Sequence, residues 1–490
     1  MKVVFVHLDL GIGGAEMLVV NAAVAARRAG HDVVIYTSHH DESRCFKETT
    51  GQGVLAGRIR VRGDWLPRHL AFGRFTALCA VARMLWLAVC VVASETVAAV
   101  GGGVGPGVGG DGSGRSEVVA TREGKEENEG RKKDAATVVF CDGVSAPVPL
   151  LRLAGPVLFY CHFPDKLLCV RRGPALKRAY RWPLDLLEEV TTASASSVAV
   201  NSNFTAGIFR EAFPRLGRAF SSGRHAAAGA EAARGGSRRV LRVLYPPTDV
   251  GAYPERGHGE TRPASIVWPV VSLNRFERKK NLPLAVEALG WALGEMGVEE
   301  ASRRGLRLVI AGGGYDKRVP ENVDHLSELK ACAARLGLDS LVEFRTNVAD
   351  DARAELLRQA SCVLYTPSRE HFGIVPVESM CCGAPVIAVN SGGPLETVVH
   401  EGTGFLCDAT AEAFGSAIVR LARDPSLGGA MGERGRQRVQ EKFSMESFAG
   451  AFEASLQELA VSSPSGGGRF FAGFFLVGAA VAAIGATLAR

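Results

Sequence analysis

Cysteine pairs are nearly absent from this sequence, although it holds 11 cysteines. No two of them follow the C-x-x-C spacing, and only Cys381 and Cys382 are adjacent. The others stand singly, several inside apolar runs, as is typical of buried thiols in a reducing compartment. His39 and His40 also lack partner ligands at metal spacing. The pattern argues against a disulfide framework, and we expect no metal site.

A strong charge of one sign is missing as well. The formal net charge is only +6, and the basic residues are scattered or fall in two segments of biased composition. Binding of nucleic acid needs a dense basic stripe, so nucleic acid is disfavoured as a partner. The mild positive balance suits an anionic lipid surface or a diphosphate substrate. The N-terminus has no basic stretch followed by a long apolar one, so we expect no signal peptide and a cytosolic soluble bulk.

The sequence does contain enough apolar residues for more than one core. Its 490 residues are 47% apolar and 22% charged, which is a globular composition. This length favours two domains of roughly 200 residues each. We place the first at residues 1–250 and the second at residues 262–460, because a second series of strand patterns begins near Ala264.

Both halves alternate short apolar runs with helical patterns. Lys2–His7 suits a buried parallel strand, a glycine turn follows, and Ala15–Arg28 has helical spacing that stops at Gly30. This alternation predicts a doubly wound α/β domain in each half. The other predicted strands are Asp32–Thr37, Thr137–Cys141, Val157–His162, Ser197–Asn201, Ile266–Leu273, Leu306–Ala311, Leu341–Arg345, Cys362–Thr366 and Pro385–Val389.

Two insertions interrupt the first half, near residues 101–136 and 217–239. The first is Gly-rich and then charged, and the second is rich in Ala, Gly and Arg. Neither has the apolar content to bury a core, so both are predicted to be disordered surface loops.

The C-terminal tail holds a charge-free segment, Phe470–Ala489, beyond a flexible linker. Its 20 residues would span roughly 30 Å as a helix, which is the thickness of a hydrocarbon core. We predict a transmembrane or membrane-anchoring helix; the alternative is a terminal helix packed on the protein. A shorter run, Met84–Ala93, is bracketed by Arg83 and Glu95 and is predicted to form a buried or interfacial helix.

The most informative polar residues lie between Glu370 and Glu378, in the segment EHFGIVPVE. This segment follows a predicted strand, and Pro376 suits the first turn of a helix. Free amides at such a helix start, together with the helix dipole, favour a phosphate group. One carboxylate can then meet a sugar and the other a ribose. The amides of the predicted phosphate cradle belong to Phe372, Gly373, Ile374 and Val375.

Other interpretations of the two glutamates stay open at this point. Glu370 and Glu378 could be ordinary surface carboxylates, or the acid and base of a glycosidase. A glycosidase needs its two carboxyl groups close together across one bond. A diphosphate cradle between them argues against hydrolysis.

The segment Arg275–Asn281, RFERKKN, follows another predicted strand. Ligands bind at the carboxyl ends of strands in open α/β sheets, so Arg275 and Lys280 could both reach a diphosphate. Alone, this segment would be read as a solvated charged loop. Together with the Glu370 segment, it favours diphosphate binding.

Two weaker signals lie in the first half. The loop Gly11–Glu16 departs from the G-x-G-x-x-G pattern, and no acidic ribose ligand follows the next strand, so a dinucleotide site is disfavoured. Gly13 and Gly14 still allow a backbone to approach a sugar or phosphate closely. His162 stands at the carboxyl end of a predicted strand, where it is either a structural or a functional residue.

These segments resemble a known family. Glu370–Glu378 is similar to the E-x7-E signature of the retaining GT-B glycosyltransferases of family GT4. Longer strings closely resemble the eukaryotic dolichol-pathway alpha-1,3/1,6-mannosyltransferases, and the resemblance covers nearly everything except the insertions and the tail. These strings are His7–Glu16, Gly63–Arg68, Leu158–Asp165, Val200–Thr205, Leu244–Asp249 and Ser272–Asn281.

The resemblance implies a GT-B fold, with two Rossmann-like α/β domains facing a cleft. It also implies transfer of mannose from GDP-mannose to a dolichol-diphosphate oligosaccharide, first by an alpha-1,3 and then by an alpha-1,6 linkage. The site of action would be the cytosolic face of the endoplasmic reticulum membrane. Glu370 would contact the donor mannose and stabilise charge at the anomeric carbon, and Glu378 would hold the ribose.

The resemblance assigns further residues. Arg275 and Lys280 would clamp the diphosphate leaving group, Gly13 and Gly14 would line the cleft opposite, and His162 would bind mannose hydroxyls. Because these cations and a helix N-terminus neutralise the diphosphate, neither metal nor cofactor is expected. Two alternatives remain: a neighbouring GT4 enzyme that acts on lipid-linked sugars, such as an alpha-1,2-mannosyltransferase, or a non-catalytic scaffold that kept the fold.

Overall fold

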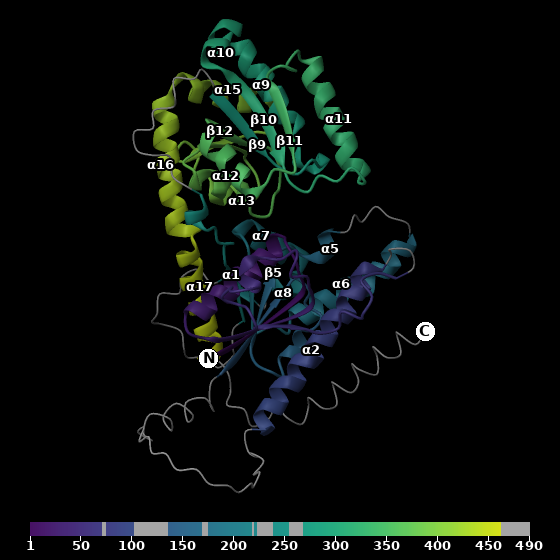
Figure 1. The fold of residues 1–490 in the computed structure, drawn as a ribbon. Coiled ribbons are helices and arrows are strands. Elements are labelled where there is room, and N and C mark those ends of the chain that lie inside the picture. The colour runs from purple at the N-terminus through teal and green to yellow at the C-terminus, as the bar shows by residue number, and fades with distance from the viewer. Residues whose placement is uncertain are drawn as a thin grey trace, which may run out of the picture. The chain divides into compact units, whose positions relative to one another are not determined.

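The chain forms two compact units, each built on a parallel β-sheet (Figure 1). Most of the two predicted insertions, and the whole predicted helix Phe470–Ala489, lie outside the residues that the structure describes. The computed structural model describes residues 1–70, 75–101, 136–168, 175–217, 220–222, 239–253 and 268–461.

The first unit holds an eight-stranded sheet in the order β3-β2-β1-β4-β5-β6-β8-β7. Val3, Val4, Phe5 and Val6 are all fully buried, so both faces of the central strand β1 are covered, as is usual for parallel sheets. The strands are β1 (Lys2–Leu10), β2 (Asp32–His40), β3 (Ile59–Val61), β4 (Thr137–Asp142), β5 (Val157–Cys161), β6 (Ser197–Val200), β7 (Phe220–Ser222) and β8 (Arg239–Val243).

Strands β1 and β2 both run three residues beyond their predicted ends. They continue because their pairing does, with Asp9 opposite His39 and Leu10 opposite His40. The helices along this part of the chain are α1 (Gly14–Arg28), α2 (Thr76–Gly101), α4 (Val148–Leu151), α5 (Asp165–Leu168), α6 (Ala175–Thr192), α7 (Asn203–Ala212) and α8 (Pro214–Gly217), with the 3-10 turn η1 (Lys47–Thr49).

Helix α2 is much longer than the predicted Met84–Ala93. Arg83 and Glu95, which were expected to bracket the apolar run, lie inside the helix because each has a partner of opposite charge. Arg83 binds Asp9 at 2.5 Å, and Glu95 binds Lys2 at 2.6 Å. The length and composition of α2 would permit a membrane span, but core helices of soluble proteins share both properties.

The second unit holds a six-stranded sheet in the order β11-β10-β9-β12-β13-β14. Its defined strand pairs are all parallel. Five of these strands match predicted ones to within two residues, whereas β14 was not predicted. The strands are β9 (Trp268–Leu273), β10 (Leu306–Gly312), β11 (Val342–Thr346), β12 (Cys362–Tyr365), β13 (Val386–Val389) and β14 (Gly404–Cys407).

Helices cover both faces of this second sheet (Figure 1). One face packs with α9, α11 and α15 into a large apolar core, and the other packs with α12 and α13. The helices are α9 (Pro283–Met296), α10 (Val298–Arg304), α11 (Pro320–Arg335), α12 (Asp350–Gln359), α13 (Ile374–Cys381), α14 (Pro394–Thr397), α15 (Ala411–Arg423) and α16 (Pro425–Lys442), with turns η2 (Val250–Ala252) and η3 (Arg278–Lys280).

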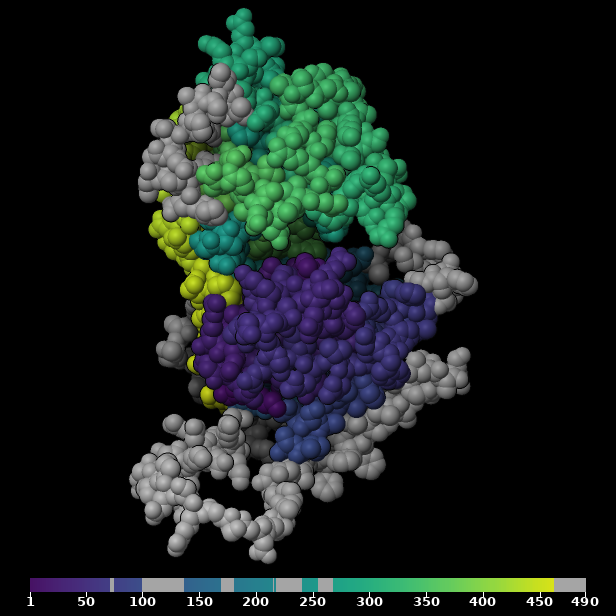
Figure 2. Space-filling model, viewed as in Figure 1, coloured from purple at the N-terminus to yellow at the C-terminus, as the bar shows by residue number. Residues whose placement is uncertain are grey.

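The two units do not coincide with the continuous ranges 1–250 and 262–460. Residues 201–207 and 243–250 belong to the second unit, and α17 (Met445–Val461) belongs from Ala449 onward to the first. The reason is a packing contact: the ring of Phe452 lies 6.3 Å from Phe5 and 5.6 Å from Phe140. In Figure 2 the visible surface of the first unit is purple and blue, the colours of its N-terminal elements, with α17 in yellow at its edge.

Candidate functional site

The second unit brings Lys280 and Glu370 together at its topological switch point. Strand order runs outward in opposite directions from β9 and β12, and ligands bind at such points beyond the carboxyl ends of the strands. Lys280 follows β9 and Glu370 follows β12. Their side chains form an ion pair, with Nζ of Lys280 2.5 Å from Oε2 of Glu370. The pair joins segments that are 90 residues apart in sequence.

The environment keeps Glu370 ionised. Burial raises its pKa, but the charge and hydrogen bond of Lys280 outweigh burial, so the pKa lies below its usual value. A further hydrogen bond ties the two loops together, because the Thr366 hydroxyl donates to the Lys280 carbonyl at 2.7 Å. The site therefore offers one fixed negative and one fixed positive charge side by side.

A glycine turn after β13 supports the Glu370 loop. Gly392 has a φ of +71°, and a Cβ there would lie 2.5 Å from the Glu370 carbonyl oxygen. The amide of Gly393 donates to that same carbonyl at 2.7 Å. Ser391, just before them, accepts from the Arg369 amide at 2.9 Å. This turn was not predicted from the sequence, although a Ser-Gly-Gly run directly after a strand is a turn signal.

The predicted phosphate cradle lies at the start of α13. The helix begins at Ile374, and Gly373 caps it in the left-handed region with a φ of +82°. None of the described side chains caps this helix start. The first amides of a helix have no intrahelical acceptor, so those at Ile374 and Val375 can serve an anion. Phe372, just before them, is buried against Tyr245 and Phe443.

Glu378 lies deeper in the same helix and is buried. The Tyr253 hydroxyl donates to its Oε1 at 2.9 Å, and Arg353 of α12 binds its Oε2. Burial raises the pKa of Glu378 against the opposing influence of Arg353 and Tyr253. Neither partner was predicted from the sequence, since neither lies in a motif; Tyr253 is 125 residues from Glu378 and Arg353 is 25 residues from it.

The predicted cation Arg275 is held differently from Lys280. Its guanidinium is more than half exposed and pairs with Glu277 at 2.8 Å, beside Lys279, which binds the same carboxylate at 3.0 Å. Its aliphatic stem lies close to Gly314, in the loop after β10. The structure therefore joins Lys280 to Glu370 and places Arg275 on a different carboxylate.

The first unit has polar residues at its own switch point, between β1 and β4. His162 follows β5, and its Nε2 lies 2.7 Å from Oδ1 of Asp142, the last residue of β4. His7 of β1 binds the other carboxylate oxygen of Asp142 at 2.8 Å. His162 was predicted as a site residue, whereas Asp142 and His7 were not.

The two predicted glycines lie where β1 leads into α1. Gly13 precedes the helix with an extended backbone, and Gly14 is the first helical residue. The carboxylate of Glu16 occupies the space that a Cβ on Gly13 would need, whereas Gly14 has open space around it. A side chain at position 13 would therefore have to displace Glu16.

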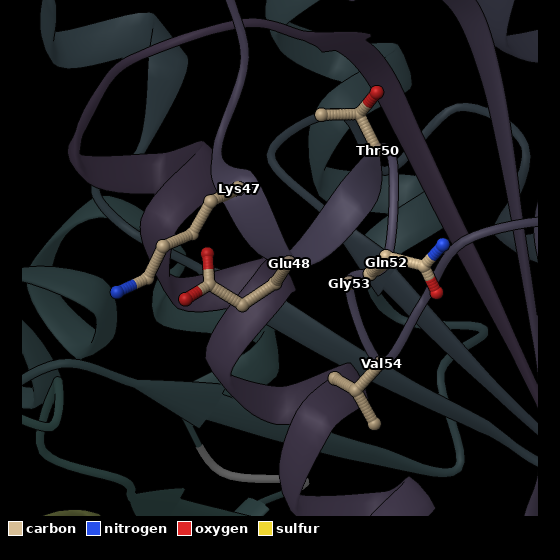
Figure 3. A pocket seen from close by; sticks show the side chains of 6 residues that line it. All are labelled: Lys47, Glu48, Thr50, Gln52, Gly53 and Val54. Atoms are coloured by element: carbon tan, nitrogen blue, oxygen red, sulfur yellow. The ribbon is translucent and has the colours of Figure 1, made fainter.

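An open surface pocket of the first unit lies apart from these residues (Figure 3). None of the predicted site residues lines it, and its side chains hold no cluster of catalytic type. The lining residues are Lys47, Glu48, Thr50, Gln52, Gly53 and Val54.

Solved glycosyltransferases share this architecture. The sucrose-phosphate synthase of Thermosynechococcus elongatus superposes with a TM-score of 0.62 at 18% identity, over 94% of this chain and 100% of that one. WaaG, a glycosyltransferase involved in lipopolysaccharide biosynthesis, gives 0.55 at 14%, over 92% and 99%. The family model "Glycosyl transferases group 1" matches residues 267–438. The fold and the match define the class: this is a GT-B glycosyltransferase of family GT4.

Closer relatives narrow the class. The alpha-1,3/1,6-mannosyltransferase of Homo sapiens is 41% identical over 455 residues, which cover 91% of this chain and 93% of that protein. The enzyme of the same name from Rhizomucor pusillus is 38% identical over 488 residues, covering 95% and 93%. The chain belongs to the family of the alpha-1,3/1,6-mannosyltransferases.

Proposed function

We propose that the protein transfers mannose from GDP-mannose to a dolichol-diphosphate oligosaccharide, adding an alpha-1,3 and then an alpha-1,6 residue to Man1GlcNAc2. The observation that carries the proposal is the similarity to the mannosyltransferases over more than 90% of the chain. The Lys280–Glu370 pair supplies the charges that such a transfer needs. The expected setting is the cytosolic face of the endoplasmic reticulum membrane.

Charge separation is the main difficulty of the transfer. As the bond between the anomeric carbon and phosphate breaks, its electron pair leaves with the diphosphate and positive charge develops on the sugar. Lys280 and the amides of Ile374 and Val375 would stabilise the departing diphosphate. Glu370, ionised beside Lys280, would stabilise the positive carbon. Fixed charges of this kind contribute most when they are placed before the reaction begins.

The remaining site residues receive supporting roles in this proposal. Glu378 would hold the ribose while Tyr253 and Arg353 orient its carboxylate. Arg275 would add a second cation for the diphosphate once it leaves Glu277. Gly13 and Gly14 would allow close approach of a substrate to α1, and His162 would bind mannose hydroxyls.

The test of the reaction is product analysis with the full chain in detergent. GDP-mannose and a Man1GlcNAc2-diphospholipid acceptor would be supplied, and the linkages formed would be read with linkage-specific mannosidases. Two mannoses, one alpha-1,3 and one alpha-1,6, are expected. An alpha-1,2 product would assign the chain to a neighbouring enzyme. No turnover by a folded preparation would favour a scaffold.

The role of Lys280 can be tested against its neighbour. Lys280→Ala should lower turnover by about 100-fold, because one preorganised charge–charge contact in the transition state contributes about 2.7–4 kcal/mol. Lys279→Ala is the matched control: that side chain is 65% exposed and binds Glu277 instead. Equal effects of the two substitutions would remove Lys280 from the site.

We also propose that the charge-free segment Phe470–Ala489 anchors the protein to the membrane and takes no part in the chemistry. Truncation before Ser462 should release part of the protein from membranes and leave activity on a water-soluble acceptor intact. Loss of that activity would mean that the tail belongs to the catalytic fold.

A further inference from the structure

Three adjacent strands of the first unit repeat one pattern on one face of the sheet. Each places an aromatic ring and, two residues later, a polar group: Phe5 then His7, Phe140 then Asp142, and Tyr160 then His162. Side chains two residues apart share a face of a strand. The strand register places Phe5 opposite Phe140, whereas Tyr160 lies opposite Asp142, so the third pair is shifted by two residues along its strand.

The aromatic row packs beneath the polar row. Ring centroids lie 5.2 Å apart for Phe5 and Phe140, and 6.1 Å apart for Phe140 and Tyr160. The Tyr160 ring also lies 4.8 Å from the His162 ring. Both the position and the tilt of the His162 ring are therefore restricted from one side by a buried aromatic layer.

The polar row is joined at both carboxylate oxygens of Asp142, by a hydrogen bond from His7 and an ion pair with His162. His7 Nδ1 donates to Oδ2 of Asp142 at 2.8 Å, and Nε2 of His162 lies 2.7 Å from Oδ1. The two ends of the row differ in exposure: the central Asp142 side chain is 0% exposed, His7 is 8% exposed and His162 is 26% exposed. Only the His162 end is open enough to meet a ligand.

The carboxylate decides which nitrogen of each ring carries a proton. Burial raises the pKa of Asp142, but the two histidines outweigh burial and the pKa lies well below its usual value. An ionised carboxylate only accepts hydrogen bonds, so each ring nitrogen that faces it must carry a proton. His162 is then protonated at Nε2, and in its neutral form Nδ1 is its acceptor.

His7 supplies the compensating charge. Burial lowers its pKa, but the hydrogen bond and charge of Asp142 oppose burial, and the charge of Glu16 and a hydrogen bond to the backbone of Asp9 add to them, so the pKa is raised. When His7 is protonated, its charge offsets that of Asp142 from the buried side. Asp142 can therefore hold the His162 ring without itself being an uncompensated buried charge.

We propose that Asp142 and His7 are positioning residues that fix the orientation and the Nε2–H tautomer of His162, so that its Nδ1 accepts a hydrogen bond from a sugar hydroxyl. The proposal rests on the role of His162 in the proposed function. Neither Asp142 nor His7 needs to touch substrate; each acts through His162.

A double-mutant cycle on the full chain tests the proposal. His162→Ala and Asp142→Asn should each lower kcat/KM for GDP-mannose by about 10- to 100-fold, the usual loss when a functional histidine loses its carboxylate partner. The double variant should fall within about twofold of His162→Ala, because a residue that acts through His162 has nothing left to position. A loss in the double variant that equals the product of the two single losses would overturn the proposal.

Asp9→Asn is the matched control. Asp9 is a carboxylate at the same sheet edge, but its side chain binds Arg83 and not a histidine. Any effect of Asp9→Asn should multiply with that of His162→Ala. An unchanged kcat/KM for His162→Ala would contradict both the proposed role of His162 and this proposal. Failure of the wild type to use GDP-mannose would instead count against the proposed function.

A second variant and a direct readout guard against misfolding. His7→Asn keeps a donor near Asp142 but removes the charge, and it should lower kcat/KM severalfold only when His162 is present. Nitrogen-15 NMR of the histidine-labelled full chain should show His162 as the Nε2–H tautomer in the wild type and in Asp9→Asn. The same tautomer in Asp142→Asn, or equal effects of His7→Asn with and without His162, would overturn the proposal.

Discussion

Three carboxylates of the candidate site differ chiefly in the residues that they bind. Glu370 pairs with one lysine near the surface, Glu378 is buried between an arginine and a tyrosine, and Asp142 lies between two histidines. A single ion pair that is partly exposed can be exchanged for a substrate group more readily than a buried network with two partners. We therefore expect Glu370 to act in catalysis and Glu378 to act in donor binding.

Substitution of the two glutamates by glutamine should separate their roles. Glu370→Gln removes the charge that faces the developing positive carbon, so it should lower kcat far more than it changes the KM for GDP-mannose. Glu378→Gln should mainly raise that KM. The expected loss in the free energy of donor binding is about 1.5–3 kcal/mol, the contribution of a hydrogen bond to a charged group. Steady-state kinetics at varied concentrations of GDP-mannose measure both parameters. The reverse pattern would show that the roles are exchanged.

His7 should make the stability of the first unit depend on pH. Because its pKa is raised in the folded chain, the stability that it supplies is fully present below pH 6.5 and is lost as pH rises through the raised pKa. His7→Asn should therefore cost about 1.5–3 kcal/mol near pH 6 and much less at pH 9. Urea unfolding of both proteins at several pH values measures this. A difference that is constant with pH would contradict the charged state of His7.

Loops between elements place the donor-side groups of the second unit. The loops after β9, β12 and β13 meet through the Lys280–Glu370 pair, the Thr366 hydroxyl and the amide of Gly393. Each loop begins at the carboxyl end of a buried strand, so the sheet fixes where it starts. The turn after β13 then fixes the position of the Glu370 backbone.

Gly392→Ala should move that backbone and lower activity. Its φ of +71° is unfavourable for alanine, and the new Cβ would lie 2.5 Å from the Glu370 carbonyl. We expect a loss of roughly 1–3 kcal/mol in stability and of about 100-fold in kcat, as for a displaced catalytic group. Gly450→Ala is the control, since Gly450 lies in α17 and a Cβ added there would meet no other atom within 4 Å. It should stabilise the helix by about 0.5–1 kcal/mol. Unchanged kcat in Gly392→Ala would mean that the turn adapts.

Across the whole molecule, the last described helix completes the first unit. Phe452 of α17 is 1% exposed and packs against Phe5 and Phe140, the residues beneath His7 and Asp142. Helix α17 therefore supports the polar row of the N-terminal sheet from the opposite end of the sequence. A fragment that stops at residue 250 would lack this contact.

Phe452→Ala should destabilise the first unit by about 3–5 kcal/mol, the usual cost of deleting a buried phenylalanine side chain. Hydrogen exchange should show lower protection in β1 and β4, and unchanged protection in β9 and β12. Phe414→Ala, in the core of the second unit, should give the opposite distribution. Val461→Ala, at a residue that is 86% exposed, should change neither. Lower protection in β9 after Phe452→Ala would contradict the assignment of α17.

Local patterns in the sequence were sufficient for the central strands of both sheets and for the two donor-side loops that hold Lys280 and Glu370. Apolar runs predicted the central strands of both sheets, and the Glu370–Glu378 segment predicted a helix start because proline and glycine constrain the backbone locally. Lys280 was found because its segment, Arg275–Asn281, follows a predicted strand. Helix α2 was predicted too short because Arg83 and Glu95 were expected to bracket the apolar run, and the partner of Arg83, Asp9, lies 74 residues away.

Long-range pairings were decided only by the tertiary structure. His7 meets Asp142 across 135 residues, Tyr253 meets Glu378 across 125, and His31 binds Glu453 of α17 across 422. Periodicity and turn chemistry describe neighbours in sequence, and they carry no information about which distant side chains share a buried site. The sequence by itself thus determined the α/β class, the family and the donor-side motif. The structure decided which charges compensate one another and which unit the C-terminal helix joins, because both depend on packing between residues that are far apart in the chain.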